Sequence, residues 1–392
     1  MNQPRDRYWL HALLFILTLI STIVAGAGMA GRELVYAEAD VWWMLVGMRI
    51  TLPWLLDGLR FGGSLLLFLT VHEFGHYFAA RYHRVSTSLP YYIPFPFNGI
   101  GTFGAVIRIR EAIPSLRTLF DIGAAGPVAG FVVALGVLIV GVATLPDLDY
   151  ILTLPGHEAL KEYISQNGAF PEAPLVESLE PGMFTLTIGS TPLYWFITRF
   201  GADVPPMWEM YHYPVLFAGW LGLFFTALNL LPVGQLDGGH ILYALVGPTW
   251  HQRLARGFVV LLLLSGGLGF ADEMAPVVAG WFPDIPGMHW VLLAGLLYFY
   301  MDRMFGGDLA ITAPGVIGMT LLIALMSRIP SVVATLGYSG WLVWCLLIVL
   351  FIKVDHPPVL YTEPLTRGRR WIAYAGLVIF FLCFSIRPLY VS

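Results

Sequence analysis

The sequence predicts an all-α polytopic membrane protein with about nine transmembrane helices and a small membrane-associated β-hairpin. Of its 392 residues, 57% are hydrophobic and 12% are charged, whereas soluble globular domains carry about 25% charged residues. Apolar runs close to the length of about 20 residues that crosses a bilayer core recur along the whole chain. The net charge of -4 leaves no strongly basic surface, so we expect contact with a lipid bilayer and none with nucleic acid.

Apolar segments define the predicted spans and basic residues define their orientation. The spans cover Tyr8–Ala30, Phe61–Arg81, Asp121–Ala143, Tyr213–Leu231, Gly257–Phe270, Met288–Met301, Gly315–Met326, Gly340–Ile352 and Trp371–Ser385. Arginine and lysine gather at alternate span ends, and such ends face the cytoplasm. We therefore expect a cytoplasmic N-terminus and an outer C-terminus. The first span also fits a cleavable signal peptide, but its apolar run continues to Ala30, which favours a retained anchor.

The chain divides into three parts on this interpretation. Residues 1–60 form an N-terminal transmembrane anchor and interfacial segment, residues 61–250 form a core, and residues 251–392 form a C-terminal group of transmembrane helices. The core includes an acidic loop, residues 145–212, which is rich in Pro and Gly and is predicted to lie outside the cytoplasm. A local strand pair is expected within this loop near Met183–Ile188.

The second span contains the sequence Val71-His72-Glu73-Phe74-Gly75-His76. On a helix, His72 and His76 share one face, where both imidazoles can reach a single zinc ion, and Glu73 lies beside them as a base for water. Two buried structural histidines beside a carboxylate are the alternative. Ionisable groups inside a span are costly and usually functional, which favours the metal site.

A third ligand is expected from the end of the fourth span. An open catalytic zinc site takes three protein ligands and keeps one position for water. Pro232 and Gly234 should break the helix after Asn229, and irregular backbone at membrane depth must be surrounded by protein or line a cavity. Asp237 follows this break at the same cytoplasmic end as the histidine pair, so it can complete a site for one zinc ion. Taken alone, Asp237 and the glycines after it also fit an ordinary turn.

These two motifs resemble the HExxH and Asn-x-x-Pro-x-x-x-Leu-Asp-Gly motifs of the site-2 protease family of intramembrane zinc metalloproteases. The resemblance covers Phe61–Gly247, and Phe120–Gly130 is similar to the segment that opens the family's middle core helix. Asp355-His356-Pro357-Pro358 and the closing span resemble the chloroplast and bacterial branch. Gly234 stands where many relatives have proline, and no segment resembles their PDZ domain. The resemblance implies that the other helices surround a three-helix catalytic core.

The implied activity is that of an intramembrane zinc endopeptidase, which cleaves single-span membrane proteins within or near a transmembrane segment, close to the cytoplasmic face. Glu73 would take a proton from water and deliver it to the leaving amine. Asn229 would bond the developing oxyanion or the substrate backbone, although a helix-interior asparagine satisfied by a neighbouring span is equally open. We expect His240, three residues beyond Asp237, to support the site rather than to bind metal.

The segment Tyr91–Glu111 predicts the hairpin, because proline and glycine precede the alternating run Ala105–Arg110. A helical substrate must be unwound before cleavage, and an extended peptide can add to a strand edge. We therefore expect Gly104, Ala105, Val106 and Ile107 to bind substrate. A surface hairpin without substrate contact is the alternative.

The third span carries two further expectations. Gly126 and Gly130 form a small-x-x-x-small pair that lets helix backbones approach, which would draw the helices carrying His72 and Asp237 toward it. Arg117 and Asp121 stand four residues apart near the start of the span, and this spacing predicts an ion pair between them.

Two other classes of protein fit parts of the pattern. A polytopic metal-ion transporter also places paired histidines and a carboxylate at membrane depth, and an inactive protease-like adaptor would keep the helices without the chemistry. Glu73 separates these classes, because only a protease needs it for chemistry and not for holding zinc. We expect a multi-pass protein of a bacterial inner (cytoplasmic) membrane.

Overall fold

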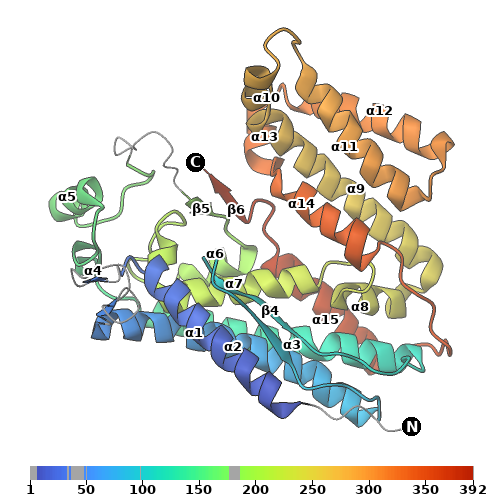
Figure 1. The fold of residues 1–392 in the computed structure, drawn as a ribbon, viewed down its shortest axis with the longest axis horizontal. Coiled ribbons are helices and arrows are strands. Elements are labelled where there is room, and N and C mark those ends of the chain that lie inside the picture. The colour runs from blue at the N-terminus through green and yellow to red at the C-terminus, as the bar shows by residue number, and fades with distance from the viewer. Residues whose placement is uncertain are drawn as a thin grey trace.

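The computed structural model is mostly helical (Figure 1). It describes residues 7–32, 51–97, 99–175 and 186–391, together with the backbone of residues 35–36 and 48–49. Most of the predicted interfacial segment within residues 1–60, and the start of the strand predicted from Met183, lie outside the described residues.

Among the described residues, five helices are long and apolar enough to cross a membrane: α1 (Tyr8–Met29), α2 (Leu52–Tyr82), α3 (Leu116–Ala143), α9 (Pro248–Glu273) and α12 (Leu309–Met326). A sixth span results if the helix pair Pro330–Leu336 (α13) and Gly340–Ile352 (α14 and the π-helical η3), bent by 44°, is one crossing. The chain is therefore a multi-pass membrane protein.

The expectation of about nine spans is not supported. Each predicted segment does contain helix, but α7 (Pro214–Asn229) has 16 residues and α15 (Arg367–Cys383) has 17. At 1.5 Å per residue, about 24–26 Å of helix falls short of a hydrocarbon core of about 30 Å. α11 (Met288–Phe305) is longer, but Asp302 and Arg303 lie in its last turn. Apolar composition alone overcounts spans where helices are short or end in charged residues.

The two central helices begin earlier than predicted because polar residues cap them. The Thr51 side chain accepts a hydrogen bond from the Trp54 backbone N–H at the start of α2. Ser115 does the same for Thr118 at the start of α3. Such caps satisfy amide groups that the first helical turn leaves without partners. The extra turns extend both helices beyond the predicted apolar runs.

Helices α1, α2, α3 and α7 pack side by side as the N-terminal half of the fold (Figure 1). Glycines set the close approach of α3 and α7: a Cβ atom on Gly219 would lie 2.7 Å from Leu138 Cα, and one on Gly141 would lie 2.8 Å from Leu216 Cα. Small residues at such crossings bring backbones into contact. α7 is thereby held along α3, with its C-terminal end directed toward the histidine pair of α2.

The predicted hairpin is present. β3 (Tyr91–Phe95) and β4 (Gly101–Val106) pair antiparallel, with a shift of register between Tyr92 and Pro94. The second strand begins earlier than the alternating run that predicted it. The hairpin packs against α1 and α2, so it lies beside the helix that carries the histidine pair.

The strand expected near Met183–Ile188 does not pair locally. β5 (Leu186–Ile188) pairs with β6 (Leu389–Val391) at the other end of the chain. The remaining short elements of this region are α4 (Asp149–Leu152), α5 (Glu158–Asn167), α6 (Pro192–Thr198) and the 3-10 turn η2 (Met210–His212), and β1 (Val35–Tyr36) pairs with β2 (Met48–Arg49). A strand of this length carries no local signal for a partner about two hundred residues away in sequence.

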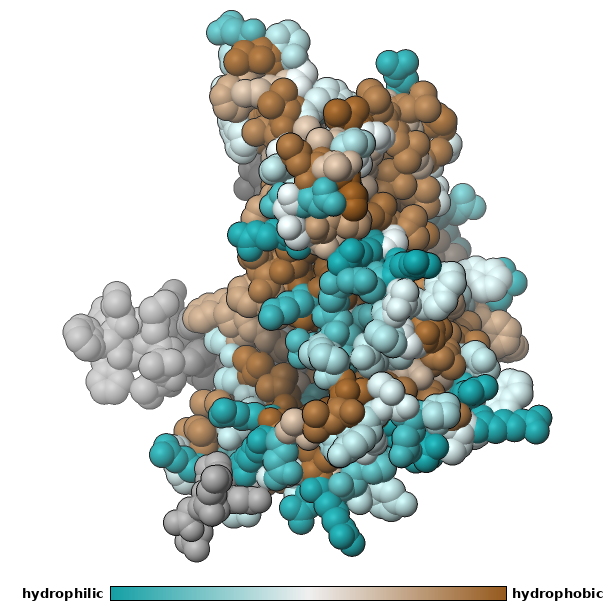
Figure 2. Space-filling view, turned by 90° about the vertical axis from the view of Figure 1, so that its right-hand side faces the viewer, coloured by the Kyte–Doolittle hydropathy of each residue, from teal (hydrophilic) through white to brown (hydrophobic). Residues whose placement is uncertain are grey.

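The C-terminal helices form a second group, in which α9, α11, α12 and α14 pack on one another with α10 (Ala275–Trp281) (Figure 1). Figure 2, which views the molecule from the right of Figure 1, shows a mainly apolar surface in its upper half and hydrophilic side chains gathered below. α15 leaves this group and packs against α3, α6, α7 and α8 (Asp237–Val246). The last helix therefore packs mainly against the core, with Phe380 also contacting Phe258 of α9.

The predicted ion pair between Arg117 and Asp121 is wrong. Asp121 accepts hydrogen bonds from Nε and Nη2 of Arg369, at 2.8 and 2.7 Å, and lies 2.8 Å from His83 Nε2. Arg117 pairs instead with Glu363 at 2.9 Å. A guanidinium that meets a carboxylate through two nitrogens is a stronger partner than one at i and i+4 on an exposed helix face. This contact ties the start of α15 to the start of α3.

Candidate metal centre

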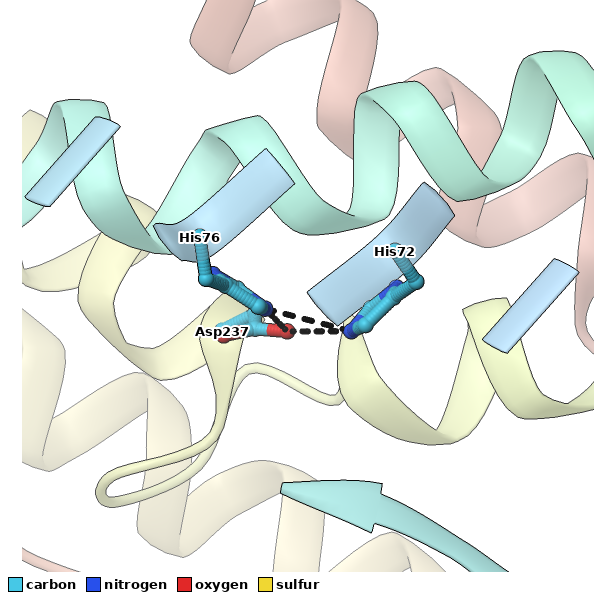
Figure 3. A group of neighbouring side chains, drawn as sticks. All are labelled: His72, His76 and Asp237. Carbon is cyan, nitrogen blue, oxygen red and sulfur yellow. Dashed lines mark hydrogen bonds and ion pairs between the residues drawn. The ribbon is translucent and has the colours of Figure 1, made fainter. Parts of the chain in front are cut away.

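The two histidines of the second span project from one face of α2 toward Asp237 (Figure 3). Their Nε2 atoms lie 3.1 Å apart, and both side chains are buried. The spacing of four residues produces this arrangement, because residues i and i+4 of a helix lie one above the other.

Asp237 reaches the histidines from the first turn of α8, after a loop that follows α7. Its Oδ2 atom lies 3.6 Å from His72 Nε2 and 3.3 Å from His76 Nε2. Ligands of a tetrahedral zinc ion, at zinc–ligand distances of about 2.0–2.1 Å, lie about 3.3–3.4 Å from one another. The three observed separations bracket this value, so the donor set fits a single zinc ion.

The backbone fixes which nitrogen of His76 faces Asp237. His76 Nδ1–H donates to the Ile122 carbonyl oxygen at 2.7 Å, which leaves Nε2 with a lone pair. A ligating histidine is commonly held in this way by a carbonyl group behind it. His72 Nδ1 is buried without a hydrogen-bond partner among the described residues, so only its Nε2 side offers polar contacts.

Glycines of α3 make the space that the imidazoles occupy. A Cβ atom on Gly126 would collide with Nε2 of His76 and lie 2.5 Å from Cδ2 and Cε1 of that ring, and one on Gly130 would lie 3.0 Å from His72 Nδ1. On the other helix, a Cβ atom on Gly75 would lie 2.6 Å from the Ala125 carbonyl oxygen. The expected pair, Gly126 and Gly130, therefore does more than bring helices together: it admits both imidazole rings.

Glu73 and the predicted substrate strand meet directly. The Glu73 side chain is 6% exposed, and the backbone N–H of Ile107 lies near its carboxylate. Gly104, with φ +98, the buried Ala105 and the half-exposed Val106 lie on β4, and Ile107 follows directly after the strand. Of the four predicted residues, Ile107 lies beside Glu73, and the other three precede it at the end of β4.

Asn229 lies at the last turn of α7, and its Nδ2 atom is 3.2 Å from His72 Nε2. The predicted proximity to the metal site is therefore present. The amide contacts a histidine in this arrangement, so a role toward the substrate oxyanion stays a prediction.

His240 is not one of the three grouped donor residues, and its side chain contacts the segment before α15. Its Nδ1 atom lies 2.8 Å from His356 Nε2. Burial and the neighbouring His356 lower the pKa of His240 to about 3, and burial lowers the pKa of His356. Both rings are therefore neutral near pH 7, and one can donate to the other.

The segment around His356 also holds the loop before Asp237. The Gly234 backbone N–H donates to the Val354 carbonyl at 3.0 Å, and a Cβ atom at Gly234 would collide with the Lys353 carbonyl oxygen. Gly234 has φ +54, a conformation that the proline ring forbids, so this loop cannot adopt the same path with the proline of many relatives. Sequence reasoning missed this contact, because its partners are more than a hundred residues apart.

A family model for peptidase family M50, the site-2 protease family, matches residues 61–267, which is about half of the chain. The chain belongs to this family. The match contains both motifs and the helices that present them.

This M50 family member is also similar to chloroplast proteins. It is 30% identical over 247 residues to the probable zinc metalloprotease EGY1 of Oryza sativa subsp. japonica, which covers 62% of this chain and 38% of the relative. Identity to EGY1 of Arabidopsis thaliana is 29% over 298 residues, or 74% of this chain and 50% of the relative. EGY2 of Arabidopsis thaliana is 28% identical over 211 residues, 54% of this chain and 33% of the relative.

The chain thus spans half or less of the length of these relatives. Their names place them in chloroplasts, which conflicts with the expectation of a bacterial inner membrane, and only the multi-pass membrane assignment stands. No solved structure matches the chain.

Proposed function

We propose that this M50 family member is an intramembrane zinc endopeptidase that cleaves single-span membrane proteins within or near a transmembrane segment, close to the cytoplasmic face. The observation that carries the proposal is the convergence of Nε2 of His72, Nε2 of His76 and Oδ2 of Asp237, with separations of 3.1–3.6 Å, beside the buried carboxylate of Glu73. The names of the relatives, which are zinc metalloproteases, support the same chemistry.

His72, His76 and Asp237 would hold one zinc ion, which when bound supplies a Lewis acid that polarises a carbonyl group and makes water acidic near pH 7. Glu73 accepts the proton of the attacking water on its carboxylate and passes it to the amine that leaves. Asn229, close to His72, holds that imidazole in place or donates to the oxygen on which negative charge develops. No step requires Glu73 to hold the metal.

The substrate is proposed to bind along β4 in an extended conformation. Amides inside a helix are already hydrogen-bonded and shielded, so the segment to be cleaved must unwind. The sheet of β3 and β4 has two strands among the described residues, and an extended peptide can add to such an edge. Because Ile107 lies beside Glu73, a peptide aligned along Gly104–Ile107 would lie next to the proposed base.

A crosslinking experiment tests the strand. A photoreactive residue in place of Val106, whose side chain is 51% exposed, should form an adduct with a bound single-span substrate. The same residue in place of Phe200, which is 78% exposed and lies after α6, should not. Adducts of equal yield at both positions, or none at Val106, would exclude the strand as the binding edge.

The central test separates chemistry from metal binding. Glu73→Gln should abolish cleavage of single-span substrates by protein reconstituted into vesicles, while the bound zinc is retained. Asp237→Asn and His72→Ala should lose the zinc ion of this site and the activity, because they remove ligands. Glu111→Gln makes the same change at an exposed carboxylate after the hairpin. This control variant should keep both the bound zinc and the activity.

Two results would contradict the proposal. If Glu73→Gln cleaved substrate at the wild-type rate, Glu73 would not be the catalytic base. A transporter would be favoured if the wild type carried zinc into the vesicles without cleaving substrate and Glu73→Gln abolished this uptake.

A further inference from the structure

A second group of histidine and carboxylate side chains lies far from the site described above. His157 precedes α5, and Glu209 and His212 lie just before α7. Asn229 marks the opposite end of α7, which has 16 residues, so the group lies about 24 Å along the helix from the first site. In Figure 1 this is the end of the helix bundle that carries α4 and α5.

Donor atoms of the three residues face one another. Glu209 Oε1 lies 2.7 Å from His212 Nδ1 and 3.8 Å from His157 Nε2. One donor atom from each residue lies within 4.8 Å of the other two. The imidazole rings of His157 and His212 are 4.7 Å apart, edge to face. Two nitrogens and one oxygen therefore surround a common point.

Burial makes this arrangement costly without a cation. The Glu209 side chain is 2% exposed and His212 is 4% exposed. A buried carboxylate needs a compensating charge. Among the described residues, Glu209 has ion-pair contacts only with His157 and His212.

The backbone presents His157 to this group in a defined tautomer. His157 Nδ1–H donates to the Pro155 carbonyl at 3.0 Å, so Nε2 carries the lone pair that faces Glu209. His76 has the same relation to Ile122 in the first site. His157 also has φ +63 and follows Gly156 at φ +69, a left-handed turn that non-glycine residues adopt uncommonly.

We propose that His157, Glu209 and His212 form a second zinc site, distinct from the catalytic centre, which fastens the loop between α3 and α7. Imidazole nitrogen and carboxylate oxygen are ligands that zinc takes in four-coordinate sites, and water would complete this one. Binding requires His212 Nδ1 to release to solvent the proton that it shares with Glu209. Two zinc ligands lie about 3.3 Å apart. Glu209 Oε1 must therefore move slightly away from His212, which is 2.7 Å away, and His157 Nε2, at 3.8 Å, must move slightly closer.

The test counts zinc in the full-length protein. The wild type, purified in detergent and equilibrated with buffered micromolar zinc, should bind two equivalents by elemental analysis. Asp237→Asn should bind one, through the second site. His157→Asn should also bind one, through the first site; asparagine tolerates the left-handed backbone but lacks the imidazole. His289→Asn, a histidine outside both groups, is the matched control and should bind two.

A single equivalent in the wild type that disappears in Asp237→Asn would overturn the second site, and so would two equivalents retained by His157→Asn. In that case Glu209 and His212 form only a buried ion pair. Because the first site is counted separately, failure of this proposal leaves the proposed protease function untouched.

A second measurement tests the site even if His157→Asn does not fold. Cobalt added to Asp237→Asn should give the visible absorption of a four-coordinate ion, and the double variant His157→Asn with Asp237→Asn should not. Absence of that absorption in folded Asp237→Asn would also overturn the proposal.

Discussion

Replacement of Gly126 by alanine tests how closely the third helix holds the metal site. The added methyl group would collide with Nε2 of His76, the proposed metal-binding nitrogen, and would lie 2.5 Å from Cδ2 and Cε1 of the same ring. Non-bonded carbon atoms are at their optimal separation at about 3.5 Å, so the ring or the helix must move by about 1 Å. His76 cannot turn away freely, because its Nδ1–H is bound to the Ile122 carbonyl on the same helix as Gly126.

The expected effect is on metal binding more than on folding. Metal sites tolerate changes of about 0.2 Å in ligand distance, and loss of support behind a ligand costs about 10–100-fold in affinity. The displacement is several times larger than this tolerance, so we expect zinc affinity to fall at least 100-fold, and cleavage with it. Overpacking should cost about 1–3 kcal/mol of stability, partly offset by a gain of about 1 kcal/mol from the higher helix propensity of alanine.

Gly136→Ala is the matched control. It is the same substitution on the same helix, and a Cβ atom there meets nothing within 4 Å among the described residues. Zinc affinity is measured by competition with a chelator, and stability by thermal unfolding in detergent. If Gly126→Ala binds zinc and cleaves substrate as Gly136→Ala does, then His76 is not held against α3 as described and the reasoning fails.

Two further substitutions test contacts with the segment before α15. Gly234→Ala should destabilise the protein by at least about 1–2 kcal/mol, because φ +54 is unfavourable for alanine and the methyl group meets the Lys353 carbonyl; thermal unfolding measures this, and an unchanged midpoint would contradict it. Arg369→Lys should cost about 1–2 kcal/mol, because lysine cannot reproduce the two-nitrogen contact with Asp121. Arg370→Lys, at the exposed neighbour, should have no effect, and equal losses in the two variants would show that the contact does not stabilise the fold.

Features with short-range or strongly periodic signals could be predicted from the sequence. The spacing of His72 and His76 fixes their common face on any helix, and the break at Pro232 and Gly234 marks where α7 ends. Alternation near Ala105 predicted a hairpin, although β4 begins at Gly101. Zinc binding by His72, His76 and Asp237 stays a prediction, and the distances between their donor atoms fit it.

Features that depend on distant partners were missed or wrong. Asp121 pairs with Arg369 rather than with Arg117, because the choice among cations is made by the packing of α15. His157 and Glu209 stand more than fifty residues apart, and nothing in the sequence near either indicates the other. The count of spans failed for a different reason: hydropathy registers apolar composition, but the length of each helix decides whether it can cross.

The amino-acid sequence by itself determined that the chain lies in a membrane, that one helix carries two imidazoles on one face, and that a helix break precedes an aspartate. Each of these follows from local chemistry: transfer of apolar groups from water, the helical repeat, and the restricted backbone of proline. Tertiary structure alone decided that Gly126 and Gly130 admit the imidazoles, that Ile107 reaches Glu73, and that the segment after α14 holds the loop before Asp237. These contacts join residues whose approach depends on how helices pack, and packing is a property of the whole chain rather than of any one segment.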